Sequence, residues 1–347
     1  MEILLYTIVF LLLLVVSNVT NRLLPQLPLP LVQIVLGISL GFILPQEKFH
    51  LDTELFLALV IGPLLFREAE ESNITSILKH WRIILFLIFP VIFISTLGLG
   101  YLAHLLWAAL PLAACIAVGA ALGPTDLVAF ASLSERFSFP KRVENILKGE
   151  GLLNDASGLV AFRVALLAWT TGSFSLGKAS ISLVLSIIGG FAVGMASAAL
   201  NRWLHKLLMS AQVSDIASEL LLELSLPLVT FFLAEEIHVS GIIAVVVAGI
   251  FKASRFKRIT LLEAQVDSVT ETIWNTVNFM LNGSVFIILG IELEMIAEPI
   301  LKSPIYDNLL LLVSIVLLTL LLFALRFLML FTFYFIRIRR LHKNVGN

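Results

Sequence analysis

The sequence predicts an all-α polytopic membrane protein with about eleven transmembrane helices. Composition is the first observation: 59% of the 347 residues are hydrophobic and 14% are charged, and the mean hydropathy is +1.02. Soluble domains carry about 25% charged residues, so lipid solvates most of this chain. Long apolar runs and a one-sided distribution of Lys and Arg are the other two observations, and together they define the spans and their orientation.

Apolar runs of about 18 residues or more predict transmembrane helices. The eleven candidate spans are centred near residues 11, 36, 59, 95, 120, 157, 190, 225, 245, 282 and 322. Glu2 precedes the first run; the basic segment of a signal peptide is absent there, so we expect a retained helix. Short loops leave no room for a soluble domain, so residues 1–347 are expected to form one transmembrane domain.

The connecting loops carry their basic residues on one side. Loops after odd-numbered spans, with the C-terminal segment, hold 18 Lys and Arg residues, and the opposite side holds three, Lys48, Lys178 and Lys302. The positive-inside rule therefore places the C-terminus in the cytoplasm and the N-terminus outside. One missed or invented span would destroy this asymmetry, which supports a count of eleven.

Charged side chains at membrane depth indicate where function lies, because they are costly there and face a bundle interior or a wet cavity. The deep ones are Asp126, Glu150, Asp155, Arg163 and Arg326. A single acid at membrane depth is either part of a functional site or one partner of a structural ion pair. The residues around it decide between these two explanations.

Asp126 stands in the stretch GPTD. Pro124 lacks an N–H and disrupts the preceding helical turn, and Gly123 eases departure from helical geometry. A helix broken at membrane depth exposes carbonyl groups, which are tolerated where they line a cavity. These carbonyls, the Thr125 hydroxyl and the Asp126 carboxylate are hard oxygen ligands suited to an alkali cation, and such broken helices are typical of secondary transporters. The alternative is a proline kink whose Asp is satisfied by a neighbour.

The next span carries a second polar stretch, GEGLLNDASG. Asn154 and Asp155 are adjacent on a helix, among small residues such as Gly158 that permit close helix packing. Two aspartates on successive spans favour a single carboxylate site. A carboxylate in a poorly solvated cavity releases its proton less readily than one in water, so Asp155 is expected to hold a proton or a cation alternately, with Asp126 and Thr125 assisting.

Three further acids lie at one end of the eighth span. Asp215, Glu219 and Glu223 fall at helical spacing on one face. This face either lines a cytoplasmic entrance or forms the polar seam of a bundle. Glu292, near the end of the tenth span, is either a functional acid or a residue of a structural ion pair or of the membrane interface.

At these residues the sequence resembles the monovalent cation:proton antiporter-1 family, the Na⁺/H⁺ antiporters of the NhaP and NHE kind. GPTD followed by GEGLLND carries the resemblance. It continues through AEEIHVSGIIAVVVAGI (234–250), NFMLNGSVFIILGIEL (278–293) and ALRFLMLF around Arg326. It covers nearly the whole chain in order.

The resemblance implies an inverted-repeat antiporter fold, assembled as a homodimer. Ion-binding core helices would lie near 83–170 and 238–336, and dimer or scaffold helices near 3–66 and 178–234.

The resemblance also implies roles for individual residues. Asp155 would be the essential ligand and Asn154 would hold the broken helices; the Thr125 carbonyl and Asp126 would complete the site. Glu150 would pair with Arg326 and fix the core. The Asn-Asp pair implies electroneutral one-for-one exchange.

Three departures from the family pattern stand out. Gly151 replaces a common serine, Leu127 follows the Thr-Asp pair where a smaller residue or proline is commoner, and the chain ends in RIRRLHKNVGN. Family members continue into a Gly-rich broken helix and one more span, so the chain is expected to be C-terminally truncated.

The function predicted is exchange of a monovalent alkali cation (Na⁺, with Li⁺ or K⁺ as alternatives) for protons across a plasma membrane. No enzymatic activity, cofactor or nucleic-acid partner is expected. The alternative is a truncated, non-transporting relative. An intramembrane aspartyl protease is disfavoured, because its Gly-x-Gly-Asp stretch and Pro-Ala-Leu loop are absent.

Overall fold

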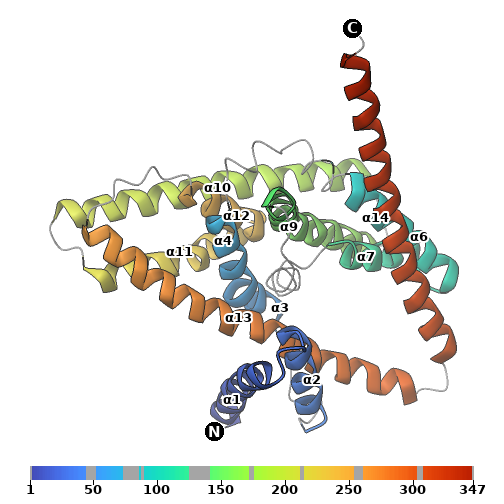
Figure 1. The fold of residues 1–347 in the computed structure, drawn as a ribbon, viewed down its shortest axis with the longest axis horizontal. Helices are drawn as coiled ribbons and strands as arrows, with labels where there is room; N and C mark the ends of the chain where they lie inside the picture. The colour runs from blue at the N-terminus through green and yellow to red at the C-terminus, as the bar shows by residue number, and fades with distance from the viewer. Residues whose placement is uncertain are drawn as a thin grey trace. The chain divides into compact units, whose positions relative to one another are not determined.

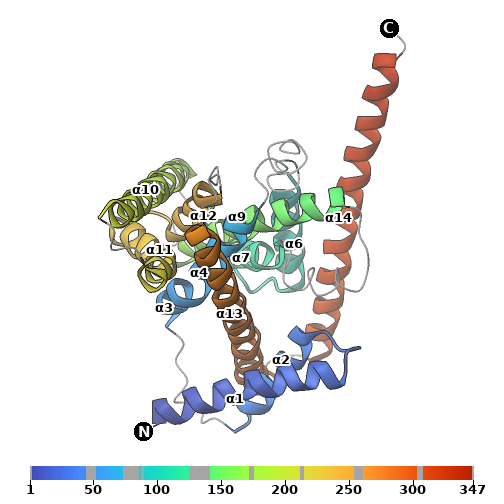
Figure 2. The same cartoon turned by 60° about the vertical axis from the view of Figure 1, so that its left-hand side comes forward.

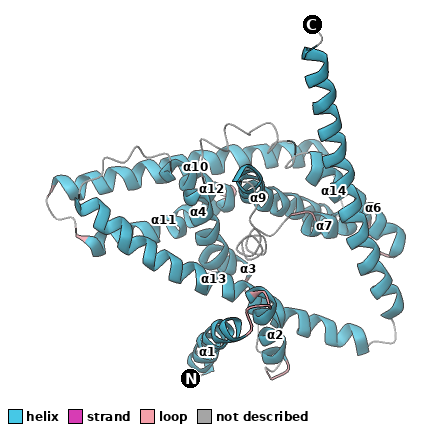
Figure 3. Ribbon diagram, in the orientation of Figure 1, coloured by secondary structure: helices cyan, strands magenta, loops and turns pink. Residues whose placement is uncertain are grey.

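A computed structural model gives the fold. It describes residues 2–43, 52–72, 86, 90–124, 141–171, 176–211, 215–253, 261–302 and 308–345. The regular elements of this part of the chain are all helical, as Figure 3 shows. Each of the eleven predicted span centres falls within a helix, which confirms the all-α prediction.

The helices follow the chain as labelled in Figure 1. Their bounds are α1 Glu2–Leu23, α2 Leu29–Gly41, α3 Thr53–Phe56, the π-helical turn η1 Leu57–Ile61, α4 Gly62–Glu71, α6 Ile92–Leu106, α7 Leu112–Leu122, α9 Lys141–Thr171, α10 Leu176–Ser210, α11 Ile216–Glu236, α12 Gly241–Ala253, α13 Leu261–Lys302 and α14 Asn308–Val345. Three segments of the described chain are long and apolar enough to cross a membrane by themselves: Val184–Ser210, Ile216–Glu236 and Asn308–Thr332.

Contacts divide the chain into two compact units. The first comprises Met1–Ile74, Leu127–Lys141 and Val184–Ser303, and the second comprises Thr75–Asp126, Arg142–Leu183 and Pro304–Asn347. The second unit therefore contains every residue predicted to bind ions. The division into ion-binding and dimer helices stays a prediction, because contacts alone do not define those roles.

In the first unit, α2 packs against α13, which Figures 1 and 2 both show. The approach is close: a Cβ atom at Gly37 would lie 2.2 Å from the Ile287 carbonyl oxygen, and one at Gly290 would lie 2.3 Å from that of Ile34. Leu14 of α1 joins Ile287 and Ile291 in a buried cluster. Small residues therefore set the spacing here, as in other membrane bundles.

In the second unit, α6 packs against both α7 and α14. A Cβ atom at Gly119 would lie 2.2 Å from the Thr96 carbonyl oxygen, so α6 and α7 approach with backbone in contact. Leu99, Cys115 and Leu318 form part of the buried apolar cluster that joins the three helices. This packing brings α14 to the end of α7, where the candidate site begins.

Candidate functional site

The helix α7 ends at Leu122, directly before the predicted break. Its 11 residues make it about 16 Å long, roughly half the hydrocarbon thickness of a bilayer. Gly123 follows with helical dihedral angles (φ −66°, ψ −44°). Pro124 comes next and cannot donate a hydrogen bond to the Ala120 carbonyl, because proline has no N–H. Thr125 and Asp126 lie outside the described residues.

The helix α9 carries the second polar stretch. Asn154 and Asp155 lie within it, but their side chains fall outside the described part of the structure. Glu150, one turn earlier, is buried with only 5% of its surface exposed. Gly158, nearly one turn after Asp155, is also buried.

Gly158 brings the two predicted stretches together. A Cβ atom on Gly158 would lie 2.2 Å from Cγ and 3.1 Å from Cδ of Pro124, and 3.5 Å from the Ala120 carbonyl oxygen. The helix that contains Asp155 therefore contacts the end of α7 directly, as expected if the two aspartates form one site. Only a residue without a side chain allows this approach.

The helix α14 contributes a basic side chain, that of Arg326, to the end of α7. The Arg326 guanidinium donates a hydrogen bond to the Gly123 carbonyl oxygen, and the charge of Glu150 acts on the same guanidinium. Arg326 thus satisfies a carbonyl at the end of α7, where the sequence predicts a break. That Glu150 and Arg326 form a structural pair stays a prediction.

Two buried hydroxyl groups of α6 escaped the sequence reasoning. Ser95 is fully buried and Thr96 is 5% exposed, and neither hydroxyl has a hydrogen-bond partner among the residues that the structure describes. The Thr96 oxygen lies 3.5 Å from the point that a Cβ on Gly123 would occupy. Hydroxyls inside an apolar span give little signal in the sequence, because they are only weakly polar.

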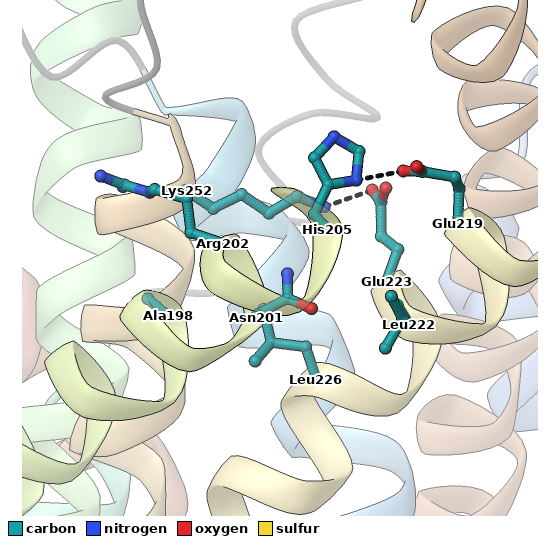
Figure 4. Close-up of a pocket in the computed structure, with 9 residues that line it drawn as sticks. All are labelled: Ala198, Asn201, Arg202, His205, Glu219, Leu222, Glu223, Leu226 and Lys252. Carbon is teal, nitrogen blue, oxygen red and sulfur yellow. Dashed lines mark ion pairs between the residues drawn. The ribbon is translucent and has the colours of Figure 1, made fainter. Parts of the chain in front are cut away.

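The first unit holds a separate polar cluster, shown in Figure 4. His205 of α10 contacts the carboxylate of Glu219. The Lys252 ammonium lies 2.5 Å from Glu223 and 3.0 Å from Glu70 of α4. Glu223 therefore forms an ion pair between helices and Glu219 contacts a histidine of another helix, as the polar-seam interpretation expects, although both also line a small pocket.

A buried acid in α13 was also missed. Glu294 is 6% exposed, and its Oε2 atom has no hydrogen-bond partner within the described residues. Glu292, which the sequence reasoning named, is only half-buried. Helical spacing could have found Glu294, because Ile287, Gly290, Ile291 and Glu294 follow the i, i+3, i+4, i+7 pattern of a buried face.

Asp215 caps the N-terminus of α11 and gives a prediction about pH. Its Oδ1 accepts a hydrogen bond of 2.9 Å from the Ser218 N–H. Hydrogen bonds from the Ser218 side chain and backbone lower the pKa of Asp215 below its usual value. The ionised Asp215 carboxylate therefore stabilises the folded state at a pH above its pKa in the unfolded chain, which is about 3.9. This stabilisation is lost as the pH falls through the lower pKa that Asp215 has in the folded state. We expect Asp215→Ala to lower the thermal unfolding midpoint at pH 7, with a smaller difference from the unsubstituted chain at about pH 3.

Asp215→Asn is the matched control, because asparagine retains the capping geometry without the charge. It should unfold between the midpoints of Asp215→Ala and the unsubstituted chain at neutral pH, because it keeps the cap and loses the charge. A gap between Asp215→Ala and the unsubstituted chain that stays constant from neutral to acidic pH contradicts this assignment.

Comparison with known proteins identifies the family to which the chain belongs. The family model described as "Sodium/hydrogen exchanger, transmembrane" matches residues 7–344. A protein of Bacillus pumilus (strain SAFR-032) named "Sodium, potassium, lithium and rubidium/H(+) antiporter" is 37% identical over 334 residues, which are 96% of this chain and 50% of the relative. Its namesake in Bacillus subtilis (strain 168) is 38% identical over the same shares. The chain thus spans about half the length of these curated relatives.

A solved structure shows the same fold. The sodium proton antiporter MjNhaP1 from Methanocaldococcus jannaschii, at pH 8, superposes with a TM-score of 0.67 at 19% sequence identity, covering 92% of this chain and 77% of that one. This likeness confirms the predicted antiporter fold class. Taken with the family match over nearly the whole length, it leads to one conclusion: the chain belongs to the sodium/hydrogen exchanger family of membrane transport proteins.

Proposed function

We propose that this chain is a secondary antiporter that exchanges a monovalent alkali cation for protons, with Asp155 as the shared carboxylate. The observation that carries the proposal is the contact between Gly158 and Pro124. It brings the Asp155 helix against the end of α7, where the sequence predicts a broken helix. Family membership supports the class of reaction, and this contact supports the proposed location of the site.

The chemistry follows from competition for one carboxylate. Proton and cation neutralise the same charge, so Asp155 holds one or the other. A cavity with low solvation disfavours the empty, charged form. If that form cannot change its exposure from one side to the other, a cation moves one way only when protons move the other way. Asp126, Thr125 and Asn154 complete the oxygen-rich surroundings in this proposal.

The relatives and the sequence together suggest the finer properties. The names of the Bacillus relatives include sodium, potassium and lithium, which supports Na⁺, K⁺ and Li⁺ as the cations to test. The Asn154–Asp155 pair supports electroneutral exchange. We further propose a homodimer in a plasma membrane, with the N-terminus outside and the C-terminus in the cytoplasm, as the distribution of basic residues indicates.

Acid-loaded proteoliposomes containing the purified chain test this function. Addition of Na⁺, Li⁺ or K⁺ outside should release protons from the unsubstituted protein, and Asp155→Asn should abolish the release, because an amide neither binds a proton nor carries charge. Asp215→Asn serves as the control, since it removes an aspartate charge outside the proposed site. Exchange that persists in Asp155→Asn contradicts the role of Asp155, and a folded chain without exchange for any cation contradicts the antiporter proposal.

A further inference from the structure

The Thr96 hydroxyl of α6 lies beside Gly123, at the end of α7. It is 3.5 Å from the point that a Cβ atom on Gly123 would occupy. The Ala120 carbonyl belongs to the same last turn of α7, and both residues lie within the second unit.

The Thr96 hydroxyl and the Ala120 carbonyl both lack an ordinary hydrogen-bond partner in the described part of the chain. Thr96 is 5% exposed, and its hydroxyl has no hydrogen-bond partner among the residues that the structure describes. The Ala120 carbonyl cannot receive the usual helical hydrogen bond, because Pro124 stands where its donor would be. A buried hydroxyl without a partner is costly, which points to a ligand that these atoms share.

The last turn of α7 adjoins the helix that contains Asp155. The Ala120 carbonyl oxygen lies 3.5 Å from the point that a Cβ on Gly158 would occupy, and Gly158 is nearly one turn beyond Asp155 on α9. The Ala120 carbonyl therefore lies beside the helix that carries the proposed carboxylate.

The charges of the region suit a cation. The five deep charged residues of the sequence are Asp126, Glu150, Asp155, Arg163 and Arg326. With all five ionised, three negative charges and two positive charges leave a net of −1. Neutral oxygens beside such a cluster would ligate an alkali cation, or a water of its hydration shell, without further changing the charge.

We propose that Thr96, through its hydroxyl oxygen and together with the Ala120 carbonyl, forms part of the alkali-cation site. This rests on the proposed function, which it deepens by adding neutral ligands to Asp155. Hard oxygen ligands suit alkali and alkaline-earth ions alike, and the number and spacing of ligands decide among cations of different size. Thr96 is thus placed to influence which alkali cation binds best.

Substitutions at position 96 test the proposal. Thr96→Val keeps the shape and removes the hydroxyl, Thr96→Ser keeps the hydroxyl, and Thr96→Ala removes it with less steric demand. Ser95→Ala is the matched control: it also removes a buried hydroxyl without a described partner, from a position turned about 100° around the helix axis. Each variant is assayed for exchange with Na⁺, Li⁺ and K⁺ in proteoliposomes.

Loss of one oxygen ligand should raise the cation concentration for half-maximal exchange about tenfold, since hydrogen bonds to charged groups are of this strength. Thr96→Val and Thr96→Ala should show this increase and an altered order of preference among the three cations. Thr96→Ser and Ser95→Ala should resemble the unsubstituted chain. Values for Thr96→Val and Thr96→Ala equal to those of Ser95→Ala overturn the proposal.

A binding measurement separates this proposal from the proposed function. Each cation is added to the detergent-solubilised chain and the shift of the thermal unfolding midpoint is recorded, because a ligand that binds the native state stabilises it. If the chain shows no exchange but a cation stabilises it, and Thr96→Val and Thr96→Ala lose that shift, the exchange proposal fails and the Thr96 site stands. If no cation shifts the midpoint of the unsubstituted chain, the Thr96 site fails.

Discussion

Gly158→Ala should reduce exchange by about a hundredfold or more. The added Cβ atom would stand 2.2 Å from Cγ of Pro124, well inside the distance at which two carbon atoms make contact. A proline ring cannot rotate away, so α9 must move from the end of α7. Misplacement by about 1 Å is enough to cost a hundredfold in activity when a site depends on alignment. Proton efflux from acid-loaded proteoliposomes measures the loss.

Gly98→Ala is the control for this experiment. Its Cβ atom would lie 2.8 Å from Leu325 Cδ1, the tip of a flexible side chain that can change rotamer. The same substitution in the same unit should therefore leave most of the exchange intact. Because alanine favours helix by about 1 kcal/mol relative to glycine, loss of helix does not explain a defect at Gly158. Full activity in Gly158→Ala shows that the contact with Pro124 is not part of a working site.

The sequence allowed the helices to be predicted because they depend on local pattern, and the proposed ion-binding stretches were inferred from local pattern too. Apolar runs locate the helices whatever their partners. Pro124 has the same effect on any helix, since it lacks an N–H. Gly158 of one polar stretch contacts Pro124 of the other, and that their two aspartates form one site stays a prediction. Family resemblance added the expected roles of Asn154 and Glu150, which spacing alone does not provide.

What the sequence did not reveal depends on contacts between distant segments. Nothing local marks the Thr96 hydroxyl as unpaired, because that follows from the packing of α6 on α7. The pairing of Lys252 with both Glu70 and Glu223 joins three helices, so no single span indicates it. Glu294 is different: the helical spacing of the buried residues on α13 was present in the sequence and pointed to it in preference to Glu292.

Arg326→Gln should destabilise the second unit. Whether the size of this effect depends on Glu150 tests the predicted pair of the two residues. Removing one partner of a buried ion pair leaves the other charge uncompensated, which typically costs about 3–5 kcal/mol. Glu150 is 5% exposed, so its carboxylate would remain poorly solvated once the guanidinium is gone. The Gly123 carbonyl would also lose the hydrogen bond that it accepts from Arg326. We expect a lower thermal unfolding midpoint and weaker exchange.

The double substitution Glu150→Gln with Arg326→Gln separates the charge from the hydrogen bond. If the two side chains form a pair, the double variant should be more stable than the sum of the single effects predicts, because neither charge is left alone. Exchange should stay low in the double variant, since the Gly123 carbonyl at the end of α7 still lacks the guanidinium. Unfolding midpoints for the unsubstituted chain, both single variants and the double variant complete the cycle. Strict additivity shows that Glu150 and Arg326 act independently, and α14 then supports the end of α7 through the hydrogen bond to Gly123 alone.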